Sequence, residues 1–157
     1  MAVFKLYSKG CEYALRALTC AAVLNENGRF QAKDVCAEAG IPESFSRKTF
    51  QALAQAGFLK ALRGPGGGYM LMRPMDKITL LDVIHAVEGD DTFDNCVLGL
   101  PMCGSKQPCP LHITWKSVKT ELLTQLKQQT LQDLADLAPR PKGPRRKGSP
   151  RPPQKRQ

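Results

Sequence analysis

The sequence predicts a mainly α-helical fold that carries one small β-hairpin. Three observations lead to this prediction. Apolar residues recur at helical spacing before residue 57, a glycine-rich turn then joins two short extended segments, and a narrow apolar stripe follows nearer the end of the 157-residue chain. Hydrophobic residues make up 42% of the chain, which is enough for the core of one domain but not of two.

Three helices are expected first, at Lys9–Leu24, Ala32–Ala39 and Pro42–Ala56. Gly28 is well placed for the left-handed cap that ends the first of them. Gly40 and the residue after it form a tight turn between the second and the third helix. Two short helices joined by a turn that contains glycine are typical of a helix-turn-helix.

A β-hairpin is expected directly after the third helix. Phe58–Arg63 is predicted as one strand, Gly64–Gly68 as the turn and Tyr69–Met72 as the return strand. A fourth helix, capped by Thr79, is expected to run to about Val87. A helix-turn-helix followed by a hairpin predicts a winged helix-turn-helix domain over residues 1–89.

The remaining chain divides into a cysteine-rich loop at 90–112, a dimerisation helix with a short last helix at 113–138, and a tail at 139–157. From Leu111 an apolar seam with little of its own chain to cover it predicts pairing with a second copy, along Trp115, Val118, Leu122 and Leu126. Thr130 and Asp133 predict a capping box before the last helix, Leu131–Leu137.

Most of the net charge of +9 belongs to the tail, which holds eight Lys/Arg and no acidic residue after residue 139. The tail is also rich in proline and poor in apolar residues, so it is expected to be disordered. Such a tail suits loose contacts with nucleic-acid phosphates, or serves as a plain solubilising extension.

Neither export nor membrane insertion is expected. No apolar run approaches the ~18 residues of a membrane span. Charges interrupt the apolar start of the chain, and no small-residue cleavage site follows it. We therefore expect a cytoplasmic protein with no membrane partner.

One face of the third helix carries groups that bind DNA. On a helical wheel, a hydroxyl, two cations and two amides share this face: Ser44, Arg47, Lys48, Gln51 and Gln55. The packing face is formed by Phe45, Thr49, Phe50, Leu53 and Ala56. The polar face is either an ordinary solvated surface or a surface that reads base edges in the major groove, and its place after the helix-turn-helix turn favours the second.

The hairpin carries Lys60 and Arg63 as its only charges. Because glycine has no side chain, the Gly64–Gly68 turn can approach a sugar–phosphate backbone closely, and Arg63 beside it can enter the minor groove. The turn is not a nucleotide-binding loop, since it lacks the Lys-Ser/Thr ending and joins two strands.

Six cysteines in a cytoplasmic chain favour metal or redox use over disulfides. Cys11, Cys20 and Cys36 stand singly in predicted helices, where cysteine usually acts as a small buried hydrophobe. The other three lie within fourteen residues of Gly/Pro-rich sequence, at Cys96, Cys103 and Cys109. Their Cys-x6-Cys-x5-Cys spacing favours an iron–sulfur cluster over zinc, which would more often show Cys-x2-4-Cys pairs, and leaves free thiols open.

Two segments, Arg63–Tyr69 (RGPGGGY) and Ile78–Glu88 (ITLLDVIHAVE), resemble the Rrf2 family of winged-helix regulators, which includes iron–sulfur regulators of the IscR and NsrR types. Cys109–Trp115 (CPLHITW) resembles the start of the family's dimer helix. The resemblance runs from Ser8 to Leu134 and leaves out the basic tail. It implies a homodimer that binds a pseudo-palindromic operator in double-stranded DNA.

The resemblance implies that Cys96, Cys103 and Cys109 hold an iron–sulfur cluster, with [2Fe–2S] favoured over [4Fe–4S]. The first cysteine spacing is one residue longer than in the IscR type, so the subfamily stays open. The fourth ligand is either His112, one helical turn past Cys109, or Glu12, which matches an acidic residue that the partner subunit supplies in NsrR-type members.

The function expected from these residues is a transcription regulator, most simply a repressor, that senses redox, iron or nitric oxide status through the cluster. The alternative is a cluster-free family member that uses its cysteines as a thiol redox switch. An enzyme is not expected, because the sequence shows no Cys-x-x-Cys pair and no arrangement of nucleophile and base. His85, amid apolar neighbours, is expected to be a packed histidine and not a ligand.

Overall fold

The computed structural model describes residues 6–24, 28–100 and 108–138. Cys103 and the basic tail, both singled out above, lie outside these ranges. In the described residues the elements follow one another as α1 (Lys9–Leu24), α2 (Ala32–Ala39), α3 (Glu43–Gln55), β1 (Leu59–Leu62), β2 (Gly68–Leu71), the 3-10 turn η1 (Met75–Lys77), α4 (Leu80–Glu88), α5 (His112–Gln128) and α6 (Leu131–Leu137). This order confirms the predicted winged-helix fold.

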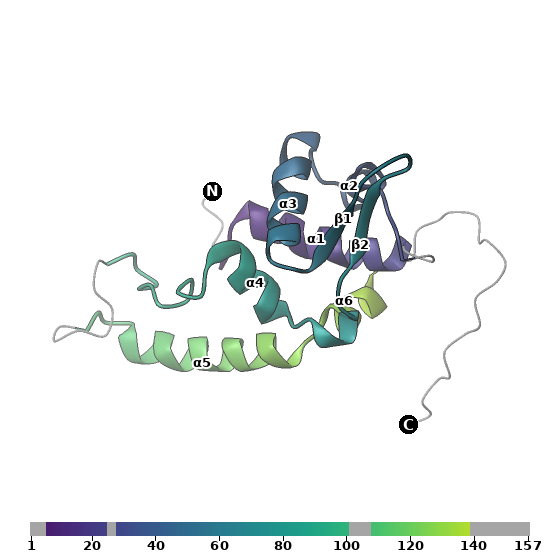
Figure 1. Cartoon of the computed structure of the whole chain (residues 1–157). Helices are drawn as coiled ribbons and strands as arrows, with labels where there is room; N and C mark the ends of the chain where they lie inside the picture. Colours follow the sequence, from purple (N-terminus) through teal and green to yellow (C-terminus); the bar gives the residue numbers. More distant parts are fainter. Residues whose placement is uncertain (1–5, 25–27, 101–107, 139–157) are drawn as a thin grey trace, which may run out of the picture.

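Helix α1 lies at the centre of the main core (Figure 1). Its buried face consists mostly of small residues, so that α2, α3, α4 and α6 all approach it closely. Phe50 and Leu53 of α3 and Val83 of α4 fill the space around it and are almost completely buried. Full burial of a side chain of this size contributes about 1.5–3 kcal/mol.

The wing is attached to the helical body by an isolated β-bridge between Phe30 and Tyr69. β1 and β2 pair antiparallel, with Leu59 opposite Leu71. Phe30 and Tyr69 then exchange both backbone hydrogen bonds, at 2.9 and 2.8 Å. The Tyr69 ring also packs against Phe50 of α3, with ring centroids 5.1 Å apart. The wing and α3 therefore share one aromatic cluster and are fixed relative to each other.

The two predicted threonine caps lie side by side and join α4 to α6. Thr79 and Thr130 each form a capping box with the acidic residue three positions later, and they pair as an isolated bridge. The Leu131 N–H donates to the Ile78 carbonyl at 2.9 Å. Hydrogen bonds from the backbone and the hydroxyl of Thr130 hold the pKa of Asp133 below its ordinary value. These contacts hold α6 against the main core, where Leu131 is buried.

A second, smaller core joins α1, α4 and α5. Its buried members are Cys11, Ile84 and Phe93, and Leu122, Leu123 and Leu126 of α5 pack against them. The predicted seam is therefore wrong in part. Leu122 and Leu126 cover apolar surface of their own chain, because α1 and α4 leave a face that α5 can reach. Val118 remains 51% exposed and Ile113 is 83% exposed, so the unpartnered apolar face lies near the start of α5.

No helix among the described residues is both long enough and apolar enough to cross a membrane.

The close contact between the wing and Phe30 gives the first prediction. Gly68 has φ +139°, and a Cβ atom there would lie 2.4 Å from the Phe30 carbonyl oxygen. Gly66, at φ +67°, has nothing within 4 Å of such an atom. We expect Gly68→Ala to lower the free energy of unfolding by about 3 kcal/mol and Gly66→Ala by about 1 kcal/mol. Urea unfolding of both variants tests this, and equal losses would contradict the close packing of the wing.

Candidate DNA-binding face and cysteine site

Helix α3 presents the polar face that the sequence predicts. All five side chains assigned to this face are exposed: Ser44, Arg47, Lys48, Gln51 and Gln55. Thr49, Phe50 and Leu53 are buried on the opposite face. Phe45 differs from the expectation, since it is 39% exposed and packs only edge-on against the Tyr13 ring, at 5.0 Å between centroids. The fold thus leaves a hydroxyl, two cations and two amides open to solvent along one helix.

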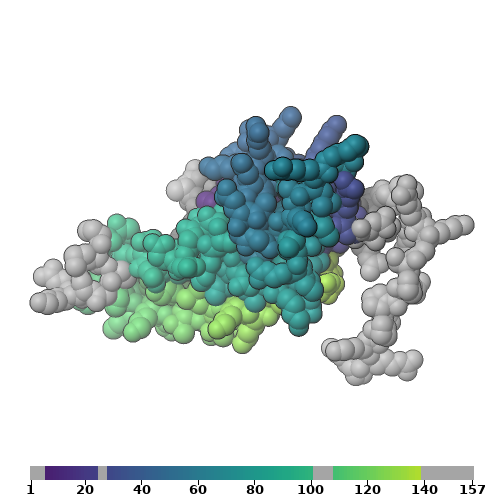
Figure 2. Space-filling model, viewed as in Figure 1, coloured from purple at the N-terminus to yellow at the C-terminus, as the bar shows by residue number. Residues whose placement is uncertain are grey.

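The wing tip stands on the same side of the molecule as α3. Figure 2 shows both projecting from the upper surface, away from α5. Lys60 and Arg63 are exposed, as predicted. The side-chain amide of Gln31 donates to the carbonyls of Gly66 and Gly67 and so anchors the glycine turn to the start of α2. Sequence reasoning missed Gln31, because nothing local marks a contact between residues 35 positions apart.

The structure brings together two of the three candidate cysteine ligands. The Sγ atoms of Cys96 and Cys109 lie 3.7 Å apart. Both residues are buried, with 7% and 8% exposure. Cys96 belongs to the segment that follows α4, and Cys109 comes just before α5. Cys103 lies outside the described residues, so the structure does not place it relative to the other two.

Residues 89–100, here called the cysteine segment, contact α5. The indole N–H of Trp115 donates to the Asn95 carbonyl at 3.2 Å, and Lys119 forms an ion pair with Asp94 at 3.6 Å. Phe93 is inserted into the second core. Trp115 was expected to face a second subunit, but its partly buried ring instead supports the cysteine segment. None of these contacts has a local sequence signal.

His112 and Glu12, the two candidates for the fourth ligand, lie on different elements. His112 is the first residue of α5, is partly buried, and its backbone N–H donates to the Cys109 carbonyl at 2.9 Å. Glu12 is in the first turn of α1, where it forms ion pairs with Lys9 at 2.8 Å and Arg16 at 2.6 Å. The structure therefore places His112 next to the cysteines along the chain and Glu12 on another helix.

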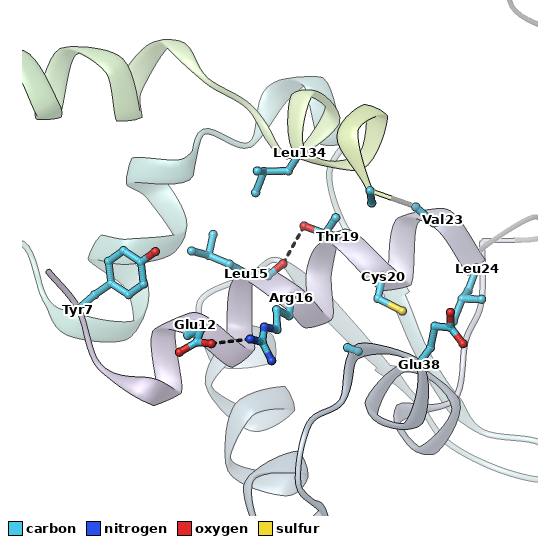
Figure 3. Close-up of a pocket in the computed structure, with 12 residues that line it drawn as sticks. Tyr7, Glu12, Leu15, Arg16, Thr19, Cys20, Val23, Leu24, Glu38 and Leu134 are labelled. Atoms are coloured by element: carbon cyan, nitrogen blue, oxygen red, sulfur yellow. Dashed lines mark hydrogen bonds and ion pairs between the residues drawn. The ribbon is translucent and has the colours of Figure 1, made fainter. Parts of the chain in front are cut away.

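Glu12 lies on the wall of a groove of about 570 Å³ between α1, α2 and α6 (Figure 3). Leu15, Val23 and Leu134 make most of this groove apolar. Glu12 and Arg16 face each other at one end of the groove, and Glu38 contributes a carboxylate at the other end. Glu12 can thus be approached from outside the chain that carries it.

Two of the other cysteines, Cys11 and Cys20, occupy surroundings that raise the pKa of their thiols. Cys11 is fully buried, and burial together with the charge of Glu88 raises its pKa to about 12. Burial, followed by the nearby Glu38 and Cys36, raises the pKa of Cys20 to about 11. Cys36 is also buried. Because a metal binds the thiolate form, Cys11 and Cys20 are poor ligands at neutral pH. Cys20 is only half-buried, where the sequence pattern suggested a core residue.

His85 is held away from the cysteine pair. Its Nδ1 atom lies 3.5 Å from a carboxylate oxygen of Asp90, and its ring centroid is 6.5 Å from that of Phe93. These neighbours agree with the prediction that His85 is a packed residue. Within the described ranges, no three His, Cys, Asp or Glu side chains gather as a metal site would require. Among the described residues, Cys96 and Cys109 thus have no third side chain of this kind grouped with them.

The winged helix, with a basic and amide-rich helix beside a glycine wing, defines a DNA-binding transcription regulator. The chain belongs to the Rrf2 family, described as iron-dependent transcriptional regulators, whose family model matches residues 7–137. It is 31% identical over 132 residues to the transcriptional regulator IscR of Cronobacter sakazakii, covering 84% of this chain and 80% of that protein. The predicted family resemblance is confirmed.

Solved structures agree with this fold. CymR, the global cysteine regulator of B. subtilis, superimposes with a TM-score of 0.68 at 24% identity, covering 88% of this chain and 100% of that one. IscR of T. potens gives a TM-score of 0.67 at 24% identity, with 92% and 93% covered. At this level of identity, the likeness establishes the winged-helix architecture and nothing about ligands.

The exposed wing tip gives the second prediction. Arg63→Ala should weaken binding to every DNA duplex and reduce the salt dependence of binding by about one unit of log–log slope, because one phosphate neutralisation is lost. Fluorescence anisotropy at several salt concentrations measures both quantities. Lys127→Ala, which removes one exposed cation from the far end of α5, is the matched control. An Arg63→Ala slope equal to that of wild type would remove the wing from the interface.

Proposed function

We propose that this chain is a homodimeric transcription repressor that senses redox, iron or nitric oxide status through an iron–sulfur cluster held by Cys96, Cys103 and Cys109. The observation that carries the proposal is the buried pair of sulfurs, 3.7 Å apart, from Cys96 and Cys109. Two ligands of one tetrahedral metal ion with metal–sulfur distances of ~2.3 Å lie about 3.8 Å from each other. The pair is thus spaced as two thiolates of a single metal ion would be.

The ligand chemistry suits iron. Soft thiolates bind iron–sulfur clusters, and the Gly/Pro-rich stretch between the cysteines allows the chain to wrap around a compact group. In a [2Fe–2S] cluster each iron ion binds two protein ligands, whereas in a [4Fe–4S] cluster each iron ion binds one. The short Cys96–Cys109 separation therefore favours [2Fe–2S]. When bound, such a cluster supplies reversible one-electron chemistry and reactivity toward oxidants.

Two groups are candidates for the remaining ligand. His112 follows Cys109 by one helical turn and is tied to it through the backbone. Glu12 would have to come from the second subunit, and its place on the wall of an open groove supports access from outside. To act as a ligand, Glu12 would exchange ion pairs with Lys9 and Arg16 for a metal bond. His112 lies beside Cys109 in the same chain, which makes it the simpler assignment.

For DNA recognition, we assign α3 to the major groove and the wing to the minor groove. Gln51 and Arg47 lie on the exposed face of α3, where they can pair with base edges, and Ser44 and Lys48 can contact phosphates. Lys60 and Arg63 then contact the backbone and the minor groove beside the glycine turn. Two such units in a symmetric dimer match a pseudo-palindromic operator.

The second subunit is proposed to cover the exposed apolar face at the start of α5. Ile113 and Val118 are 83% and 51% exposed there, and Leu111 adds to the same region at 44%. Scattered exposed apolar residues are ordinary, but three within eight positions next to the cysteine site form a patch that association would bury. A cluster at Cys96–Cys109 would then lie beside the subunit interface and be able to adjust the spacing of the two α3 helices.

The alternative function, a thiol switch without a cluster, is favoured by the same sulfur pair. Thiols 3.7 Å apart need only a small movement to form a disulfide, in which the sulfurs are ~2.05 Å apart. CymR, which has the same fold, is the global cysteine regulator of B. subtilis. The metal content of the protein separates the two functions.

The third prediction concerns the cluster. Protein purified without oxygen should be coloured and contain iron and acid-labile sulfide. Cys96→Ala, Cys103→Ala and Cys109→Ala should each abolish the colour, because a lost thiolate has no nearby replacement. Cys20→Ala and Cys36→Ala are matched controls that should keep it. Zinc or no metal in the wild type would favour the thiol switch, and loss of colour in the controls would contradict the assignment of the ligands.

His112→Ala and Glu12→Ala divide the two candidates for the fourth ligand. The true ligand, when removed, should leave a more labile cluster with a shifted absorption spectrum. Two wild-type spectra would assign the position to solvent or to a small thiol.

The fourth prediction separates the proposed interface from the second core. Val118→Glu should convert the dimer to a monomer, because it places an unpaired charge in the interface. It should lower the melting temperature only by the part that association contributes. Leu122→Glu should lower the melting temperature of each chain, because it places that charge in the second core. Analytical ultracentrifugation and thermal melts measure the two effects. An intact Val118→Glu dimer would place the association surface elsewhere.

A further inference from the structure

Glu88 at the end of α4 makes a long-range contact with Ser8 at the start of α1. It is the last residue of α4, directly before the cysteine segment begins at Gly89. Its carboxylate accepts a hydrogen bond from the backbone N–H of Ser8 at 3.0 Å and a second one from the Ser8 hydroxyl. The two residues are 80 positions apart in the sequence. The end of α4 is thereby tied to the start of α1.

Ser8 is the residue that caps α1. Its hydroxyl oxygen accepts from the Cys11 N–H at 3.2 Å, and its carbonyl accepts from the Glu12 N–H at 3.1 Å. A capping serine satisfies one of the unpaired N–H groups in the first turn of a helix, with no help from a second side chain. The carboxylate of Glu88 adds a second constraint, because it takes the hydroxyl hydrogen and so turns the oxygen lone pairs toward Cys11. The position of Glu88 therefore affects the first turn of α1.

The cysteine segment acts on the same turn through a second contact. Phe93, three residues before Cys96, packs in the second core against Cys11 of α1 and Ile84 of α4. A rearrangement around Cys96 thus reaches the first turn of α1 both through Phe93 and through the peptide that links Glu88 to the segment. Both contacts converge on Ser8 and Cys11.

Helix α1 in turn contacts α3, the proposed DNA-binding helix. The Tyr13 ring lies edge-on to the Phe45 ring, with an interplanar angle of 62°. Phe45 stands in the first turn of α3, two residues before Arg47. Phe50 and Leu53 of α3 are buried in the main core, and the Tyr13–Phe45 contact joins the first turn of α3 to α1. A shift of α1 there changes the support of the polar face of α3.

We infer that Glu88 is a positioning residue that couples the cysteine segment to the DNA-binding helix through the Ser8 cap of α1. The inference deepens the proposed function and rests on it only for the identity of the signal. A metal cluster or a disulfide that altered the cysteine segment would act through the same Glu88–Ser8 contact. The coupling can therefore be measured on protein that holds neither a cluster nor a disulfide.

The experiment is a double-mutant cycle on the full-length protein. One axis is Glu88→Ala and the other is the loop change Cys96→Ala/Cys109→Ala. Amide hydrogen exchange of Cys11 and Glu12, measured by NMR, reports the first turn of α1, and anisotropy with a duplex selected from random-sequence DNA reports α3. With Glu88 intact, we expect the loop change to alter the exchange rates by about tenfold and to change DNA affinity. With Ala at position 88, the loop change should alter both quantities by a clearly smaller factor, because only the route through Phe93 remains.

Two further variants separate positioning from a purely structural role. Glu88→Gln keeps an oxygen that accepts from the Ser8 N–H, so it should restore the coupling, whereas a requirement for bulk alone would also be met by Glu88→Met. Glu38→Ala, which removes an exposed carboxylate from α2, should leave the coupling intact. The inference is overturned if the loop change has the same effect with and without Glu88, or if it has no effect on α1 in the wild-type background. Absence of iron from the protein would contradict the proposed function and leave this result standing.

Discussion

The burial of α1 is the constraint on which the rest of the structure depends. One face of this helix, built from Ala14, Ala17, Leu18 and Ala21, forms the centre of the main core. Its first turn contributes Cys11 to the second core, which reaches the cysteine segment and α5. A helix with larger side chains at the three alanines would hold its neighbours too far apart to close both cores. The small residues of α1 thus connect the DNA-binding half of the molecule with the half that carries the cysteines.

This arrangement gives the cysteine segment a mechanical role that its sequence alone does not reveal. The segment is fixed at Phe93, at Asp94 and at Asn95, each to a different side chain or core. Such fixed points make the segment a bridge between α4 and α5. In the proposed function, a change of state at Cys96 and Cys109 acts through these attachments, which lead to α1 and to α5.

The helices, the wing, the Thr79 cap and the Thr130 capping box could be predicted from the sequence, because each depends on residues close together in the chain. The pairing of Phe30 with Tyr69, the Gln31 contact with the wing and the Glu88–Ser8 contact could not, since each joins segments 35 or more positions apart. The seam on α5 was misassigned for a related reason. Leu122 and Leu126 have the spacing of a pairing helix, but periodicity does not distinguish a partner subunit from another surface of the same chain.

The link between the proposed cluster and DNA binding can be tested directly by comparing one preparation with and without its iron and sulfide. Protein purified without oxygen is divided, iron and sulfide are removed from one half with a chelator, and both halves are titrated against the same selected duplex by fluorescence anisotropy at fixed salt. The proposed coupling between cluster and DNA predicts dissociation constants that differ by about tenfold or more, as expected for a coupling free energy of 1–3 kcal/mol. Equal dissociation constants, in a preparation shown to contain iron and sulfide before treatment, would contradict it.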